Sequence, residues 1–150
     1  MGMETVHCQL RHASPEELET AEKIVRGEAD ASRLMLGVRQ AELLVSYEHD
    51  TEGMTDGELP VQVLLLGDVP VFIMPGELYH QFGLKLRAQY PRCLTATLCN
   101  GFFGYMPAPE LFGTDVYPVQ LCSGSKWEPA AGDKVTDCAC GIARRLLEKR

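Results

Sequence analysis

A long apolar stretch, residues 59–74, restricts the fold more than any other part of this chain. The stretch is interrupted at Gly67-Asp68, a dipeptide typical of tight hairpin turns. The pattern therefore predicts two antiparallel strands, at residues 59–66 and 69–74. Both strands are nearly continuous in apolar residues, so we expect the sheet to be covered on both faces. Residues 4–10 and 93–99 predict two further strands.

Helical spacing of apolar residues predicts four helices. They cover about residues 15–26, 29–47 and 78–90, and a final stretch that begins near residue 132. The first helix should begin at a capping box, with Ser14 as the N-cap, Pro15 at the first helical position and Glu17 closing the box. Residues 100–131 are irregular and rich in proline and glycine, with a short strand predicted at residues 117–121. The pattern predicts a single α+β domain over residues 1–150, with a small mixed β-sheet of buried strands covered by amphipathic helices.

Composition excludes several classes of protein. The formal net charge is −7, which argues against a nucleic-acid partner because phosphate binding needs a basic surface. No apolar run approaches the roughly 20 residues of a transmembrane helix. The first residues lack the features of a signal peptide, so we expect a cytoplasmic protein if Met1 is the true start. The six cysteines have no zinc-knuckle spacing, and we expect reduced thiols.

Two polar side chains follow predicted strands at glycine-containing turns. Glu77 comes after Pro75-Gly76, and Tyr105 ends the stretch from Asn100. The first is either a functional carboxylate or an acid that stabilises a helix start near the helix dipole. The second is either a phenol directed into a cleft or a packing aromatic beside Phe102 and Phe103.

Other chemical signatures are weak. Glu77 and His80 have a Glu-x-x-His spacing, but the metal sites that use it need two copies. The remaining histidines are scattered along the chain. Ser123-Gly124-Ser125 is not the Gly-x-Ser-x-Gly elbow of serine hydrolases, and we interpret it as a loop.

Residues 59–147 resemble the C-terminal part of the catalytic domain of neutral (non-lysosomal) ceramidases and their bacterial relatives. Three segments carry the resemblance: VQVLLLGDVPVFIMPGE, LCNGFFGYMPAPELF and EPAAGDKVTDCACGIARRLL. The first resembles a strand-turn-strand that ends in Pro-Gly-Glu. The second resembles the family's Asn-x-Tyr-x-x-Tyr-x-Thr-Thr-x-Glu-Glu-Tyr segment. The third resembles the start and body of the final helix in the bacterial proteins.

The resemblance implies a zinc-dependent amidohydrolase that cleaves the N-acyl amide bond of ceramide or a related lipid amide. The family's zinc ligands are two histidines, a glutamate and a tyrosine. The resemblance places the glutamate at Glu77 and the tyrosine at Tyr105, with Tyr105 also taking a catalytic role. We therefore expect the two residues to be near neighbours. Pro107-Ala108 replaces the family's Thr-Thr, which points to a substrate other than ceramide itself.

The family's histidine ligands lie upstream of the matching region and have no counterpart in this chain. Zinc would then belong to the complete enzyme, and this chain alone would be inactive without a missing N-terminal portion. Two alternatives remain open. One is a non-catalytic α+β module that binds a small ligand or a partner. The other is self-association that rebuilds a site with His80 or His49 of a neighbouring copy.

Overall fold

A computed structural model describes residues 1–149, and it shows an α+β fold built on a four-stranded mixed sheet. The strand order is β1-β2-β3-β5, with antiparallel β1–β2 and β2–β3 pairs and a parallel β3–β5 pair. The predicted hairpin is confirmed, and Gly67 takes a positive φ of 61° in its turn. The four strands are β1 (Gly2–Gln9), β2 (Asp56–Leu66), β3 (Val69–Ile73) and β5 (Leu94–Ala96).

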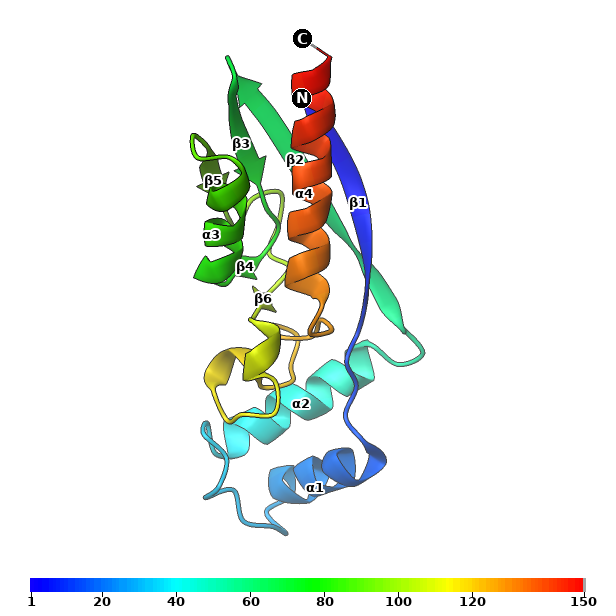
Figure 1. The fold of residues 1–150 in the computed structure, drawn as a ribbon. Helices are drawn as coiled ribbons and strands as arrows, with labels where there is room; N and C mark the ends of the chain where they lie inside the picture. Colours follow the sequence, from blue (N-terminus) through cyan, green and yellow to red (C-terminus); the bar gives the residue numbers. More distant parts are fainter. Residues whose placement is uncertain (150) are drawn as a thin grey trace.

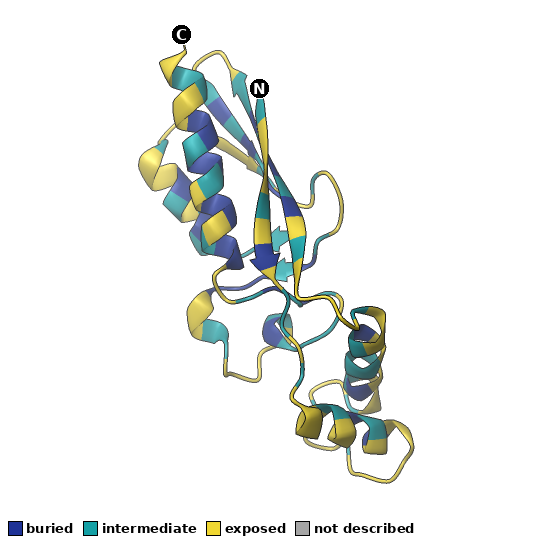
Figure 2. Ribbon diagram, turned by 90° about the vertical axis from the view of Figure 1, so that its right-hand side faces the viewer, coloured by how far each residue is buried: buried dark blue, intermediate teal, exposed yellow. Residues whose placement is uncertain are grey.

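Two helices cover one face of this sheet (Figures 1 and 2). Helix α4 (Ala131–Glu148) packs on β1 and β2, and α3 (His80–Gln89) packs beside α4. Alternate strand residues point toward these helices, among them Leu59, Val61 and Phe72, none of which is exposed. Their burial forms the main hydrophobic core, to which α4 contributes its apolar stripe.

The prediction that the sheet is covered on both faces is only partly right, because the second face is half-buried and neither α3 nor α4 packs on it (Figure 2). The opposite face carries Leu64, Val71, Ile73 and Leu94, and α3 and α4 both lie on the other side (Figure 2). Leu94 is 54% exposed on this face. An apolar strand sequence shows which residues avoid water, but it does not show what covers each face. The predicted buried strand at residues 93–99 is reduced to the short edge strand β5, because the chain leaves the extended conformation at Leu98, where φ is 58°.

The first two helices form a second unit, between β1 and β2 in the sequence and below the sheet in Figure 1. Helix α1 (Pro15–Val25) begins at the predicted capping box, with the Glu17 amide donating to Ser14 Oγ at 3.2 Å. Helix α2 (Val38–Asp50) begins nine residues later than predicted, because residues 28–37 form turns instead. The pair has its own small core of Ala21, Ile24 and Ala41.

The segment between β5 and α4, residues 97–130, contains no long helix or strand, as predicted for residues 100–131. It holds the two-residue strand β6 (Tyr105–Met106) and the 3-10 helices η1 (Pro109–Leu111) and η2 (Tyr117–Val119). The prediction of a short strand at residues 117–121 is therefore wrong. Strand β6 pairs in parallel with β4 (Glu77–Leu78), which follows β3 directly. This small second sheet brings the two predicted site residues together.

Candidate functional site

Glu77 and Tyr105 are paired residues in the two-stranded sheet of β4 and β6. The Glu77 amide donates to the carbonyl oxygen of Gly104 at 2.8 Å, immediately before Tyr105. The expectation that the two residues are near neighbours is confirmed. Whether they ligate a metal stays a prediction.

The backbone here depends on glycines that pack against one another. Gly76 has a positive φ of 64°, and a Cβ there would lie 2.3 Å from the carbonyl oxygen of Gly104. Gly104 has a φ of 81°, and its Cβ would lie 2.5 Å from the carbonyl oxygen of Gly124. Real Cβ atoms do not approach oxygens this closely, so larger residues at either position would push the turns apart. Three turns, far apart in sequence, thus fix the places of Glu77 and Tyr105.

Glu77 does not lie at the start of a helix, which corrects one interpretation of the sequence. Pairing with residues 104–106 draws its backbone into β4, and α3 begins only at His80. The Glu-x-x-His spacing therefore places no two side chains on one helical face. His80 is exposed at the first position of α3.

The aromatic neighbour of Tyr105 is Tyr117, not the predicted Phe102 and Phe103. The rings of Tyr105 and Tyr117 pack edge to face, with centroids 5.7 Å apart. Phe102 is 66% exposed, while Phe103 packs against the main core. Proximity in sequence suggested the wrong partner because the chain turns sharply at Gly104.

The pKa of the Tyr105 phenol is raised above its usual value. Burial is the largest cause, followed by the negative charge of Glu77 and the neighbouring Tyr117 phenol. The phenol therefore stays protonated at neutral pH and can donate a hydrogen bond. Glu77 provides an acceptor beside it, so the pair presents one proton donor and one carboxylate.

Arg11 anchors the segment that packs against Tyr105, whose amide donates to the Gly124 carbonyl oxygen at 2.8 Å, and no pattern in the sequence pointed to Arg11. Its guanidinium donates to the carbonyl oxygens of Val119, Ser125 and Trp127 at 3.1, 2.6 and 3.0 Å. Burial lowers the pKa of Arg11, and the cation also lies over the Phe112 ring at 4.9 Å. The end of β1 is thereby tied to the segment that includes Gly124.

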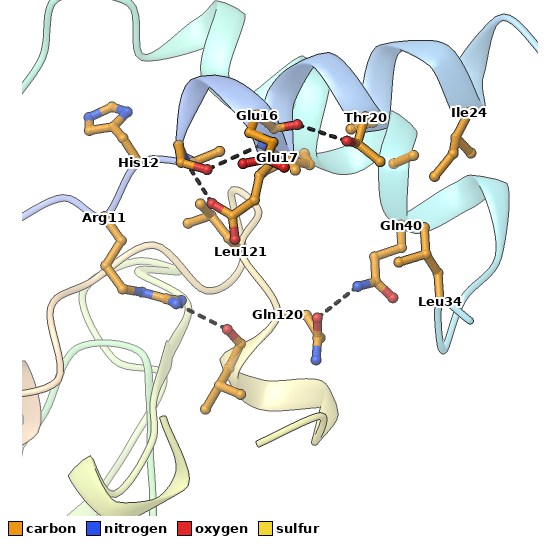
Figure 3. Close-up of a pocket in the computed structure, with 16 residues that line it drawn as sticks. Arg11, His12, Glu16, Glu17, Thr20, Ile24, Leu34, Gln40, Gln120 and Leu121 are labelled. Atoms are coloured by element: carbon orange, nitrogen blue, oxygen red, sulfur yellow. Dashed lines mark hydrogen bonds between the residues drawn. The ribbon is translucent and has the colours of Figure 1, made fainter. Parts of the chain in front are cut away.

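A narrow slot beside Tyr105 joins the site to the helical pair. The slot is bounded by Tyr105, Tyr117 and Gly124 on one side and by Leu36 and Leu43 on the other. It shares Gln40, Gln120 and Leu121 with a larger open cavity of about 690 Å³ between α1, α2 and residues 119–121. The Gln40 amide donates to Gln120 Oε1 at 2.7 Å where the two spaces meet (Figure 3).

The larger cavity has an apolar floor and a polar rim. Ile24, Leu34 and Leu44 contribute to the floor, and Glu16, Glu17 and Thr20 lie along the rim. In Figure 3, Ile24 and Leu34 lie beyond Gln40, on the side away from Arg11. An apolar floor with polar groups at the mouth is typical of small-molecule sites.

Residues 1–149 provide only part of a zinc ligand set. Glu77 and Tyr105 are adjacent oxygen donors, but no group of three histidine, cysteine or acidic side chains in that range could hold a metal ion. A catalytic zinc usually has three protein ligands and a water. The six cysteines are free thiols and form no such cluster there either.

Comparisons of this chain with models of protein families, with curated proteins and with solved structures gave no match. The fold and the paired positions of Glu77 and Tyr105 are therefore the observations that bear on function. None of the four helices in residues 1–149 is long and apolar enough to cross a lipid bilayer.

Proposed function

We propose that this chain contributes Glu77 and Tyr105 to the zinc site of a ceramidase-like amidohydrolase acting on a lipid amide. The direct pairing of Glu77 with Tyr105 is the observation that carries the proposal. A helix and a strand separate the two residues along the chain, and glycine turns with no space for a side chain bring them together. The resemblance at Pro75-Gly76-Glu77 and at residues 98–112 points to the same two residues.

The complete site needs histidines from another polypeptide or segment. Zinc bound there would polarise the amide carbonyl and activate water. This chain's own residues would do two things. Glu77 would offer an anionic oxygen, and Tyr105 would offer a phenol that donates a hydrogen bond while it is protonated.

A chemical complementation experiment tests this proposal. Imidazole in solution replaces the absent histidines, and Co²⁺ replaces zinc because its visible absorption reports coordination. We expect the chain with imidazole to bind Co²⁺ and to give a new absorption band. Glu77→Gln and Tyr105→Phe should each weaken binding by tenfold or more, which corresponds to about 1.4 kcal/mol or more.

Matched controls make the result specific. Glu58→Gln and Tyr90→Phe change the same side-chain types away from the pair, since Glu58 is on β2 and Tyr90 packs on Phe72, and should leave the Co²⁺ affinity unchanged. Equal Co²⁺ binding by the wild-type chain and the Glu77→Gln, Tyr105→Phe double variant would refute the proposal. The folded state of each variant is checked by its urea transition.

A non-catalytic ligand-binding module is the second candidate, and the cavity of about 690 Å³ favours it. Its apolar floor would accept an alkyl or aromatic group, with the rim contacting a polar end. Titration with an environment-sensitive acyl probe tests this function. Leu44→Trp would fill the floor and should abolish the fluorescence change, whereas Leu84→Trp, on exposed α3 surface, should not. Binding that survives Leu44→Trp excludes this cavity.

A further inference from the structure

The outer edge of β1 is an unpaired strand edge in the described part of the chain. β1 ends the strand order β1-β2-β3-β5 and pairs only with β2. The Leu10 amide, one residue beyond β1, donates to Thr55 on the β2 side at 2.9 Å. Because amide directions alternate along a strand, the amides of Met3, Thr5 and His7 point away from β2.

The backbone amide and carbonyl groups at the Gln9 end of the same edge already have hydrogen-bond partners. The Gln9 amide donates to Glu128 Oε1 at 2.8 Å, and the Gln9 carbonyl oxygen accepts from the Glu128 amide at 3.0 Å. These bonds confirm that odd-numbered residues of β1 face outward. The edge is therefore closed at Gln9 and open from Met3 to His7, and β1 is the edge strand of the sheet, on the right of its upper part in Figure 1.

We propose that a second copy of this chain pairs with this edge, β1 against β1 in antiparallel orientation, about a two-fold axis at Thr5. In this register, Thr5 lies opposite Thr5 of the second copy, and Met3 lies opposite His7. The three outward residues of each copy then satisfy one another's amide and carbonyl groups. The proposal is independent of the zinc site, because Glu77 and Tyr105 lie in the separate β4–β6 sheet.

Helix α4 has the right position for this arrangement. It packs equally on β1 and β2, so its axis lies above the boundary between these strands. Adjacent strands are about 4.8 Å apart, so a two-fold axis just outside β1 would place the two α4 helices roughly 10 Å apart. Packed helices are usually about 8–10 Å apart, so the second copy fits without a clash of the helix backbones.

The side chains of α4 at the level of the axis are small. Arg145 pairs with Glu4, Cys138 Sγ lies 3.8 Å from Glu4 Oε2, and Lys134 pairs with Glu128 at 2.7 Å. Thr5 therefore lies at the level of Cys138 and Gly141, between the lysine and arginine positions. A Cβ on Gly141 would meet only the flexible Arg145 side chain, so this part of α4 has space for a neighbouring helix.

Charge does not oppose the pairing. Antiparallel α4 helices would bring Lys134 of one copy near Arg145 of the other. Each cation already has a carboxylate partner within its own chain, Glu128 for Lys134 and Glu4 for Arg145. Each end of the interface thus holds two cations and two carboxylates, and their formal charges sum to zero.

Hydrogen exchange and sedimentation of the full chain test the proposal together. We expect a monomer–dimer equilibrium in which the amides of Met3, Thr5 and His7 become protected as the concentration rises. The amides of Glu4 and Val6 already face β2 and should be protected at all concentrations. A chain that sediments as a monomer throughout overturns the proposal, as does a dimer in which the three outward amides still exchange freely.

Two variants test the register. Thr5→Pro removes an outward amide from each copy and should raise the dimer dissociation constant about tenfold or more. Thr5→Val keeps the amide and should leave the dimer dissociation constant nearly unchanged.

Cross-linking is a second test of the register. A short bismaleimide should link Cys138 to Cys138 of the second copy, and Cys138→Ser should abolish this product while Cys122→Ser should not. This second measurement needs no proline, so it decides the proposal even if Thr5→Pro fails to fold.

Discussion

The sheet with α3 and α4 differs from the α1–α2 pair in the depth of its core. The sheet core includes Leu59, Val61, Val63, Phe72 and Val135, all with no exposed surface. The core that α1 and α2 share holds only Ala21, Ile24 and Ala41 as buried residues, and two of these are alanines. Tyr47 of α2 is buried as well, but outside this core, where its hydroxyl donates to the Arg11 carbonyl oxygen. Hydrophobic stabilisation grows with the apolar area removed from water, so the two regions should differ widely in local stability.

The candidate site lies where these two regions meet. The glycine turns that fix Glu77 and Tyr105 belong to the deeply packed region. Leu36, Gln40 and Leu43, on the other side of the slot, belong to the thin helical pair. We therefore expect a rigid wall at the glycine turns and a less stable wall at the helical pair.

The sheet core should respond most strongly to substitution. Phe72→Ala removes a ring that has no exposed surface and that packs 5.5 Å from the Tyr90 ring. We expect a loss of about 3–5 kcal/mol of unfolding free energy, measured by urea denaturation. Leu94→Ala on the uncovered face should cost less than about 1 kcal/mol. Equal losses for the two variants would contradict the one-sided core.

The rigid wall is tested at its glycine contact. Gly104→Ala combines a positive φ with a methyl group 2.5 Å from the Gly124 carbonyl oxygen. We expect a cost of about 3 kcal/mol and a change in the pKa of Tyr105, followed by NMR of labelled tyrosine. Gly113 also has a positive φ but has open space around it, so Gly113→Ala should cost about 1 kcal/mol and leave Tyr105 unchanged.

Features that depend on local patterns could be predicted from the sequence in both regions. The hairpin at Gly67-Asp68, the capping box at Ser14 and the apolar stripe of α4 each depend on local patterns, and all three are confirmed. The adjacency of Glu77 and Tyr105 could also be predicted. That prediction depends on a family resemblance together with strand ends, because residue spacing alone favours a structural role for each.

The remainder depends on contacts that no local pattern encodes. Arg11 looks like an ordinary surface cation in the sequence, yet it holds three carbonyls from residues 119–127. The interpretation of Ser123-Gly124-Ser125 as a loop is correct, but the contact of Gly124 with Gly104 depends on the tertiary fold. The periodicity of apolar residues also predicts that α2 includes residues 29–37. In the structure these residues form turns, which end at Gly37 with a positive φ.

The thin helical pair should unfold locally when Ile24, the largest buried residue of the core shared by α1 and α2, is reduced. Ile24→Ala should remove about 2 kcal/mol from the local stability of α1 and α2. Hydrogen exchange should accelerate at amides of these two helices and stay unchanged in β2 and α4. Val25→Ala, an exposed neighbour in the same helix, is the control. Loss of protection throughout the sheet would show that the two regions form one cooperative unit.

The weakest effect concerns His12, which links the entry of α1 to the end of α2. Its Nδ1 lies 2.9 Å from Glu48 Oε2, and its Nε2 lies 2.8 Å from the Met54 carbonyl oxygen. Both partners accept hydrogen bonds, so the contacts favour the doubly protonated ring, which can donate from both nitrogens. The pKa of His12 is accordingly raised, first by the hydrogen bond to Glu48.

A histidine whose pKa is higher in the folded state stabilises that state fully below its unfolded pKa of about 6.5. The contribution disappears as the pH rises through the folded pKa. We therefore expect exchange protection in α1 and α2 to fall as the pH rises from the unfolded pKa of about 6.5 through the higher folded pKa. His12→Gln should remove this pH dependence, while His49→Gln at an exposed position should keep it. A pH dependence that persists in His12→Gln would assign the effect to another group.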